Sequence, residues 1–555
     1  MGGNTLSLIN DDKTLTKYAG STELGLLWSM PFNAQIRDVI YQYIDYVKGF
    51  EDSIIDSWPV QRLRYVYQLQ TAHFVYPSAT HTRFNHSLGV MHLSYKYMNQ
   101  LLRSITKYSD RGTDKLREVL SKSREAVIAA RILGLLHDIG HGPFSHAFDT
   151  YVYKNRDFLG YRLGNHELLG YIIYRDYLRD EIRKTITNHN DVLGVDVDFV
   201  IDILDESLKP PLGMKDHTDL VSKNIIRLDE FYVPRPDKAI HGIVRLVVRD
   251  YIYTSDIIDY LRRDSYFTGL PLGNINDEWL IRNTYLLEHH GLLVPAISTK
   301  AVDDLVRLLN ARKMMYKNVY LHHVNIAFDE TIGFLLNCLR DYIAGIIDKM
   351  LESSDNLRLY LSLTDYSIYG LLQMIMARGD IGNLCRDYRE LARQSLENLF
   401  IHRKPAWKRL DTFIYDLRSA RHIFSNRFGD IMQKAIRETI KREIAQELGA
   451  KGFSEEDVRV VIESISIYPS ASREIIKYLL LAKLRDEKPI DVREENPDRF
   501  AEKNGLIPEA LFIVYLNRNK YRKLIEEELN RARYIVIDIL EDAIGGKIKE
   551  APETS

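Results

Sequence analysis

Apolar residues recur at helical spacing along most of this chain. Between residues 84 and 102 they fall three or four positions apart, as on one buried face of a helix; they are Leu88, Met91, Tyr95, Met98 and Leu102. Residues 124–139 carry apolar side chains around most of a helix circumference, which indicates a central buried helix that Gly140 ends. The pattern predicts a mainly helical fold.

Strand signals are short. Residues 73–76 precede a Pro-Ser turn, and residues 243–248 form a short apolar run. Loops are expected at 108–115, 209–216 and 449–454, where Gly452 and Ser454 indicate a helix end followed by a new N-cap. Any sheet is therefore expected to be a minor ornament.

Composition and charge exclude several classes of protein. The 75 basic and 77 acidic residues give a net charge of −2, so no overall field draws the chain to nucleic acid or a membrane surface. No apolar run is long enough to span a membrane, and the N-terminus lacks the order of a signal peptide. The two cysteines, far apart in the sequence, exclude a disulfide framework and a thiolate zinc site, which favours a reducing cytoplasm.

Histidines are concentrated in one part of the chain, with eight of the 17 between positions 73 and 166. The run GLLHDIGHGPFSHAFD, residues 134–149, combines three of them with two aspartates around Gly140 and Gly142, which let the backbone turn close to a ligand. Imidazole with carboxylate suits a borderline divalent ion such as manganese, iron, nickel or zinc, and suits magnesium less well.

Two histidines and two aspartates on one ion leave positions open for a water and a phosphoryl oxygen, which favours hydrolysis of a phosphoester. His86 and the pair His137-Asp138 supply three such ligands. The segment 254–264 offers the fourth as Asp256, with Asp259, one turn later on the same helix face, as its nearest competitor.

Several polar residues also have plainer interpretations. His73 and His92 are expected to be ordinary packed or surface histidines. For Asp259 and Arg263, a solvated ion pair fits nearly as well as a cleft. Arg312, Tyr316 and Tyr320 share one helix face, and periodicity alone favours the edge of the core over the surface.

Four stretches together resemble the HD-domain deoxynucleoside triphosphate triphosphohydrolases, a family that includes bacterial dGTPases and an animal enzyme with an added sterile-alpha-motif domain. They are DSWPVQRLRYVYQL (56–69), HTRFNHSLGV (81–90), LLHDIGHGPFSHAFD (135–149) and DIIDYLRRD (256–264). The likeness covers roughly residues 30–500, without a sterile-alpha-motif domain.

The resemblance implies metal ligands and catalytic groups at matching positions. It makes His86, His137, Asp138 and Asp256 the ligands of a divalent ion. It makes His146, oriented by Asp149, the acid that protonates the leaving 5′-oxygen, and it places His141 and His166 near the α-phosphate.

The resemblance also implies substrate contacts. These are Arg83 and Tyr260 for phosphate, Gln68 and Asp264 for the sugar 3′-hydroxyl, Tyr320 with Leu69 as a gate against a 2′-hydroxyl, and Arg312 as a further contact. The implied reaction is attack of water at the α-phosphorus, which releases a deoxynucleoside and intact triphosphate.

A regulatory nucleotide site at subunit contacts is implied at Asp56, Gln61 and Arg64, with GTP or a deoxynucleotide as activator and a homo-oligomer, dimer or tetramer, as the assembly. The chain departs from the family nearby. Ala34 and Tyr41-Gln42 stand where the family has a lysine and His-Gly, and Ile257 replaces a phosphate-binding lysine, for which Arg263 or Lys317 could compensate.

We therefore expect an N-terminal extension (1–24), a helical HD-domain core (25–330), a helical C-terminal lobe (331–544) and a disordered tail (545–555). The preferred function is hydrolysis of deoxynucleoside triphosphates. One alternative keeps the metal chemistry but acts on another phosphoester, such as a signalling or cyclic nucleotide. A second alternative is a nucleotide-binding module without turnover.

Overall fold

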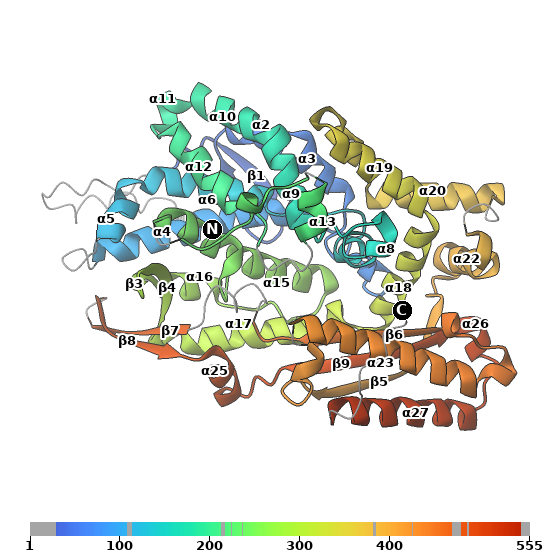
Figure 1. Cartoon of the computed structure of the whole chain (residues 1–555). Coiled ribbons are helices and arrows are strands. Elements are labelled where there is room, and N and C mark those ends of the chain that lie inside the picture. Colours follow the sequence, from blue (N-terminus) through green and yellow to red (C-terminus); the bar gives the residue numbers. More distant parts are fainter. Residues whose placement is uncertain are drawn as a thin grey trace, which may run out of the picture.

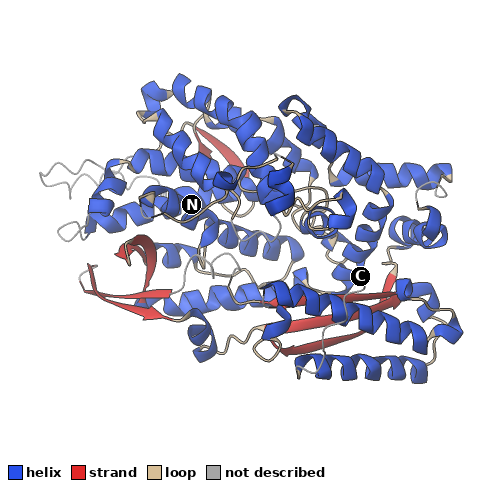
Figure 2. Ribbon diagram, in the orientation of Figure 1, coloured by secondary structure: helices blue, strands red, loops and turns tan. Residues whose placement is uncertain are grey.

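The computed structural model describes residues 29–107, 114–211, 217–223, 225–235, 237–380, 385–424, 426–468, 479–485 and 488–545. Helices dominate these residues and the sheets are small, which confirms the predicted fold class (Figure 2). None of the described helices is long and apolar enough to span a membrane. The predicted N-terminal extension, residues 546–555 of the predicted tail, and most of the loops at 108–115 and 209–216 lie outside the described residues.

Two long helices pack against each other: α4 (Arg83–Lys107) and α6 (Ser123–Leu136) (Figure 1). Both were predicted, and α6 is buried from Glu125 to its end. They approach closely at Gly134, where an added Cβ would lie 3.1 Å from the Met91 backbone. A third helix, α15 (Ser255–Thr268), packs against α4 and completes the frame of the site described below.

Further helices surround this frame, and one large hydrophobic cluster joins them. Those of eight residues or more are α5 (Asp114–Ser121), α9 (His166–Ile173), α10 (Arg179–Asn188), α12 (Val197–Ser207), α17 (Val302–Met315), α18 (His323–Cys338), α19 (Arg340–Glu352), α20 (Asp365–Arg378) and α22 (Arg389–Glu397).

Three small sheets are described. Strands β1 (Ala34–Asp38) and β2 (Gln42–Tyr46) form an antiparallel hairpin. The second sheet has the order β3-β4-β7-β8, with β4 and β7 parallel and the other pairs antiparallel; its strands are Thr284–His289, Leu292–Ser298, Leu479–Arg485 and Lys488–Glu495. The third sheet has the order β5-β9-β6, with strands Trp407–Asp416, Glu509–Asn517 and Val458–Ile465.

The C-terminal part builds a core of its own. Helices α23 (Asn426–Glu447) and α27 (Glu526–Ile544) pack on the β5-β9-β6 sheet, and their apolar faces form a separate hydrophobic cluster with it (Figure 1). The strands of this sheet were not among those that the sequence pattern predicted. Central strand β9 is buried from Ala510 to Asn517, and a continuous apolar run of this kind does not distinguish a strand from a buried helix.

Both strands that the pattern did predict are wrong. Residues 72–74 form a 3₁₀ turn, and residues 243–248 lie in α14 (Ala239–Arg245) and a π-helical turn, Leu246–Asp250. The apolar residues of 243–248 are buried on these helical segments rather than in a sheet. The loop at 449–454 agrees with prediction, because Gly452 has a φ of 76° and Ser454 caps the next short helix.

The two cysteines are paired. Cys338, at the end of α18, forms a disulfide with Cys385, and their Cα atoms are 5.0 Å apart. A separation of 47 positions in the sequence thus did not prevent a bond, and the expectation that this distance excludes a disulfide is wrong.

One buried arginine donates hydrogen bonds both to the loop after α6 and to the segment before α20. Arg62, 1% exposed, donates hydrogen bonds from its Nη1 to the His141 carbonyl (2.7 Å) and from its Nε to the Tyr360 carbonyl (2.9 Å), and a further one to the Leu363 carbonyl. Its guanidinium also stacks 3.7 Å from the centre of the Tyr360 ring. Three backbone acceptors therefore depend on this side chain.

We expect Arg62→Met to lower the free energy of unfolding by about 3 kcal/mol, because the three buried carbonyls would lose their partner. Arg64→Met is the matched control; Arg64 is exposed, and its loss should change the free energy by less than about 1 kcal/mol. Chemical denaturation followed by circular dichroism measures both. Equal unfolding midpoints for the two variants would contradict the prediction.

Candidate metal centre

The four predicted metal ligands come together where three helices meet. His86 lies in the first turn of α4, His137 and Asp138 directly follow α6, and Asp256 lies in the first turn of α15. The Thr254 side chain caps α15 by accepting a hydrogen bond from the Ile257 amide. An aspartate at this end also interacts favourably with the helix dipole.

The donor atoms of these residues face one point. The Nε2 atoms of His86 and His137 are 3.3 Å apart, and Asp256 Oδ1 lies 3.1 Å from the first and 3.8 Å from the second. Asp138 reaches both imidazoles, with Oδ2 3.7 Å from His86 Nε2 and Oδ1 3.4 Å from His137 Nε2. His86, His137 and Asp138 are buried, so these groups have little water around them.

Both histidines are oriented for metal binding through Nε2. His137 Nδ1 lies 2.8 Å from the Gly134 carbonyl, and His86 Nδ1 lies 2.8 Å from Asp259 Oδ2. Each Nδ1 therefore donates its proton to an acceptor, which leaves the Nε2 lone pair directed at the shared point. This is the usual arrangement of metal-binding histidines, and the donor set fits a divalent ion.

Charges at the centre are strongly coupled. Burial disfavours a charge on His86, but the carboxylates of Asp256 and Asp259 outweigh it and raise the pKa of the His86 imidazole to about 10. Burial alone would raise the pKa of Asp138, yet His137 and Arg83 hold that pKa well below its usual range. A proton and a metal ion thus compete for His86, so acid is expected to release the ion.

A second polar group lies directly beside these ligands. His141 Nε2 is 3.6 Å from Asp138 Oδ1, and the His141 ring stacks on His166 with centroids 3.5 Å apart. Asp149 Oδ2 lies 2.7 Å from His166 Nδ1 and 3.2 Å from His146 Nδ1. The His146 side chain is 61% exposed whereas Asp149 is buried, so the buried carboxylate orients an accessible imidazole.

Gly140 and Gly142 allow close packing beside the predicted ligands. A Cβ on Gly140 would lie 2.0 Å from the His166 carbonyl, so only glycine lets α9 bring His166 beside His141. A Cβ on Gly142 would lie 2.3 Å from the Phe148 ring. Both Cα atoms thus face packed protein, and the expectation that the backbone turns close to a ligand here stays a prediction.

The residues predicted to contact the sugar form a connected cluster. Asp264 accepts a hydrogen bond from the Tyr320 hydroxyl (2.7 Å) and lies 2.8 Å from His81 Nε2, a residue that was not predicted to contribute. The Gln68 backbone amide donates to the His81 carbonyl, and the buried side-chain oxygen of Gln68 has no hydrogen-bond partner among the described residues. Leu69 is buried next to Gln68.

Both arginines that were predicted to contact substrate pair with other predicted site residues. Arg83 pairs with Asp138 and donates to Ser145 Oγ, which lies in a strained turn where Phe144 and Ser145 both have positive φ. Arg312 donates to the Tyr260 hydroxyl (3.2 Å) and is buried, as the core-edge interpretation predicted.

The residues of the implied regulatory site also lie together. Gln61 donates from Nε2 to Asp56 Oδ1 (3.3 Å) and accepts from Arg64 Nε (2.8 Å), at an exposed corner formed by α3 (Trp58–Arg62) and the residues beside it. Their regulatory role stays a prediction.

The departures from the family pattern have structural consequences. Ile257 is buried in the core, 3% exposed, and Arg263 is fully buried in ion pairs with Asp259 and Asp38. Arg263 therefore cannot reach a phosphate, and the suggestion that it compensates for Ile257 is wrong. The interpretation of Asp259 and Arg263 as a solvated ion pair is also wrong, since neither side chain is exposed. Lys317 pairs with Glu509 at 3.0 Å.

Two histidines with plainer interpretations are packed in the fold. Burial lowers the pKa of His73 to about 4 and that of His92 to about 3, and neither belongs to a metal-compatible group among the described residues. Another group of possible donors, His289, His290 and Glu494, lies at the β3 and β8 strands and is partly exposed.

A known protein family matches the part of the chain that holds most of this centre. A family model described as HD domain matches residues 83–211, a stretch that contains His86, His137 and Asp138. The chain contains an HD domain. Asp256 lies beyond the matched stretch and reaches the centre through the packing of α15 on α4.

Relatives of the HD-domain chain are distant. A putative HD domain-containing protein of Acanthamoeba polyphaga mimivirus is 27% identical over 60% of this chain and 63% of its own length. The deoxynucleoside triphosphate triphosphohydrolase SAMHD1 of Homo sapiens is 26% identical over 62% of this chain and 51% of its own. A homologue of SAMHD1 from Dictyostelium discoideum is 29% identical over 54% of this chain and 48% of its own. The matches thus span about half to two thirds of these relatives.

We expect the protein to bind a divalent ion at this centre and His137→Ala to weaken that binding at least about 100-fold, beyond the 10- to 100-fold loss typical of outer-shell changes. Binding is measured by competition with a chelator and by elemental analysis. The double variant His289→Ala/His290→Ala serves as the background, because it removes the partly exposed group. Unchanged metal content in the His137→Ala variant would contradict the assignment.

Proposed function

We propose that this chain is a metal-dependent phosphohydrolase that hydrolyses deoxynucleoside triphosphates to a deoxynucleoside and inorganic triphosphate. The observation that carries the proposal is the direct contact of two groups: the metal-compatible set around His86 and His137, and the set of His141, His146, Asp149 and His166. A site with an electrophile beside an oriented acid suits cleavage of a phosphoester.

In this proposal each group has one task. A divalent ion held by His86, His137, Asp138 and Asp256 would lower the pKa of a bound water and polarise a phosphoryl oxygen. His146 donates a proton to the 5′-oxygen as its bond to the α-phosphorus breaks, and Asp149 keeps the imidazole oriented. The oxygen of the attacking water stays on the released triphosphate.

His141 and His166 would contact the α-phosphate beside this acid. Burial alone would lower the pKa of His166, but Asp149 raises it, which favours a cationic ring next to an anionic substrate. Arg83 and Tyr260 are proposed as further phosphate contacts. Arg312 donates a hydrogen bond to the Tyr260 hydroxyl and positions it.

A deoxyribose would lie at the cluster around Asp264. Its carboxylate and the unpaired Gln68 oxygen offer acceptors for a 3′-hydroxyl, and Tyr320 with Leu69 would exclude a 2′-hydroxyl. The named activity of the human and Dictyostelium relatives supports this substrate class.

A second candidate is an HD-domain phosphohydrolase that acts on another nucleotide, such as a signalling or cyclic one. Two observations favour it. Ile257 is buried where the family has a phosphate-binding lysine, and Arg263 forms buried ion pairs with Asp259 and Asp38. Neither position therefore offers a cation to a triphosphate.

Activation by GTP or a deoxynucleotide, and assembly into a homo-oligomer, extend the proposal. Asp56, Gln61 and Arg64 would contact the activator. Ala34 in β1 stands where the family has a lysine, and Tyr41-Gln42 at the start of β2 stand where it has His-Gly. Any activator would therefore make fewer contacts with the protein here.

Product analysis tests the reaction. The protein is incubated with each of the four deoxynucleoside triphosphates and Mn²⁺, Fe²⁺, Ni²⁺, Zn²⁺ or Mg²⁺, with and without GTP. We expect deoxynucleoside and tripolyphosphate in equal amounts. Orthophosphate, pyrophosphate or a deoxynucleoside monophosphate would overturn the proposed bond cleavage, and absence of turnover under all conditions would favour a binding module.

A variant at the proposed acid tests the mechanism. His146→Ala should lower kcat by about 10²- to 10⁴-fold while metal binding is retained, because only the proton donor is lost. His402→Ala, at an exposed histidine that ends the π-helical turn Asn398–His402, is the control and should keep full activity. A His146→Ala enzyme as active as this control would show that another group donates the proton.

A further inference from the structure

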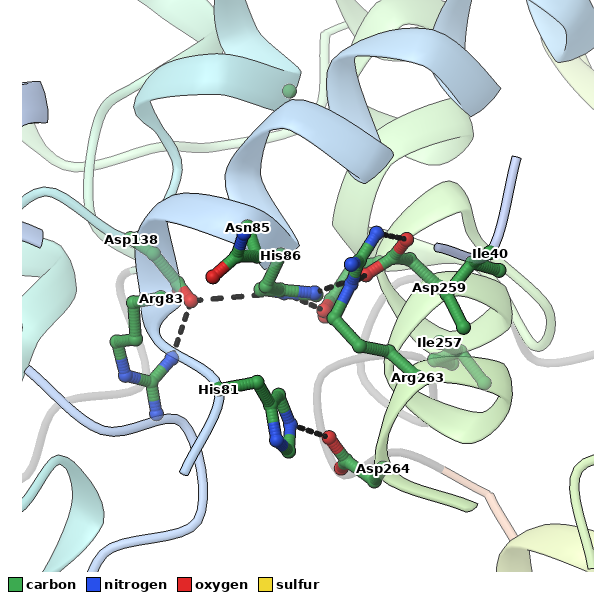
Figure 3. Close-up of polar contacts among 12 residues, drawn as sticks. Ile40, His81, Arg83, Asn85, His86, Asp138, Ile257, Asp259, Arg263 and Asp264 are labelled. Carbon is green, nitrogen blue, oxygen red and sulfur yellow. Dashed lines mark hydrogen bonds and ion pairs between the residues drawn. The ribbon is translucent and has the colours of Figure 1, made fainter. Parts of the chain in front are cut away.

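Asp259 stands out because both of its carboxylate oxygens are used and neither faces the metal-compatible point. Its Oδ2 lies 2.8 Å from His86 Nδ1 and 2.9 Å from Arg263 Nε, and its Oδ1 accepts from Arg263 Nη2 (3.0 Å) and from the Tyr41 hydroxyl (2.8 Å). Asp256, by contrast, lies on the Nε2 side of His86. Asp259 is therefore not the competing ligand that the sequence suggested, since it contacts the opposite edge of the imidazole (Figure 3).

The contacts of Asp259 continue into the N-terminal hairpin. Arg263 Nη1 lies 2.9 Å from Asp38 Oδ2, and Asp38 Oδ1 accepts from the backbone amides of Ile40 and Tyr41, at 2.8 and 3.0 Å. Asp38 thus both accepts hydrogen bonds from the backbone amides of the β1–β2 turn and forms an ion pair with Arg263. Through Asp38 and Tyr41, the turn holds both partners of the ion pair behind His86.

A glycine in α4 makes room for this arrangement. Gly89 lies three residues after His86, on the same helix face, and a Cβ there would come 1.9 Å from Asp259 Oδ1 and 2.6 Å from Arg263 Nη2. Only a residue without a side chain lets α15 approach closely enough for Asp259 to reach the His86 ring.

Burial makes this network costly unless it serves a specific contact. The side chains of Asp259 and Arg263 are 0% exposed, and a buried ion pair often contributes no more stability than apolar residues of the same size. A carboxylate that accepts the outer N–H of a metal-binding histidine fixes the tautomer and orientation of the ring and raises its basicity. This contact accounts for a charged pair at this place.

We propose that Asp259 is the positioning residue for metal ligand His86 and that the β1–β2 hairpin, through Asp38 and Tyr41, holds Asp259 in place. The proposal rests on the proposed metal-dependent function, because it assigns His86 to an ion. It makes the N-terminal hairpin, 40 or more residues before the ligand in sequence, a part of the metal centre.

Metal affinity of the full-length protein tests the proposal, measured with Co²⁺ and Mn²⁺ by competition with a chelator. Asp259→Asn keeps the shape but not the charge and should weaken binding about 10- to 100-fold. Tyr41→Phe and Asp38→Asn lie one contact further out and should each weaken it by a smaller factor. The visible spectrum of bound Co²⁺ should change in all three, because the His86 ring is less firmly oriented.

Matched controls lie on the same hairpin. Tyr43→Phe alters an exposed tyrosine that stacks on Arg37, and Asp45→Asn alters a carboxylate that binds Gln35; neither contacts Asp259 or Arg263, and both should bind metal like the unaltered protein. If Asp259→Asn fails to fold, the Tyr41→Phe and Asp38→Asn variants still decide the question.

The outcomes separate this proposal from the function on which it rests. If the unaltered protein and a His137→Ala variant bind metal equally, both the metal centre and the positioning role are wrong. If the centre binds metal but Asp259→Asn, Tyr41→Phe and Asp38→Asn match their controls in affinity and Co²⁺ spectrum, only the positioning role is wrong. Lower activity with unchanged affinity and spectrum would also overturn it.

Discussion

The close approach of helices α4, α6 and α15 is the constraint on which the rest of the structure depends. Two glycines allow this approach: Gly134 of α6 lies against α4, and Gly89 of α4 lies against Asp259 and Arg263 of α15. Because the backbones come so near, short side chains from the three helices can reach one point. A larger residue at either position would separate His86 from Asp256 or from the His137-Asp138 pair.

This close packing places many ionisable groups in a region with little water. Unpaired charges there would be costly, and almost every one has a partner of opposite charge or a hydrogen bond. His86 lies between Asp256 and Asp259, and Asp138 lies between Arg83 and the imidazoles. The result is a preorganised set of nitrogen and oxygen donors whose orientation is fixed before any ion arrives.

The same logic extends outward from the centre in two directions. On one side, Asp149 orders His146 and His166 beside the ligands. On the other side, the Asp264 carboxylate contacts both the His81 ring and the Tyr320 hydroxyl. In both places one buried carboxylate organises two ring side chains, so the chemistry of the site depends on few acidic residues and on the helices that carry them.

The amino-acid sequence by itself determined the helical class, the two central helices and three of the four residues that meet at the candidate metal centre. Helical spacing and the density of histidines are local signals, and His86, His137 and Asp138 lie in such segments. Sequence did not identify the strands of the C-terminal sheet. Its central strand β9 is a buried apolar run, which has no period that distinguishes strand from helix. Sequence also assigned 243–248 to a strand for the same reason.

Tertiary structure decided how Asp256 and Asp259 lie relative to His86, which periodicity could not. Both lie on one face of α15, one turn apart, so periodicity treats them alike. Only the position of α15 against α4 shows that Asp256 faces Nε2 of His86 and Asp259 faces Nδ1. The parts played by Asp38, Tyr41 and His81 were likewise invisible in sequence, because their partners lie more than 180 residues away and only packing brings them into contact.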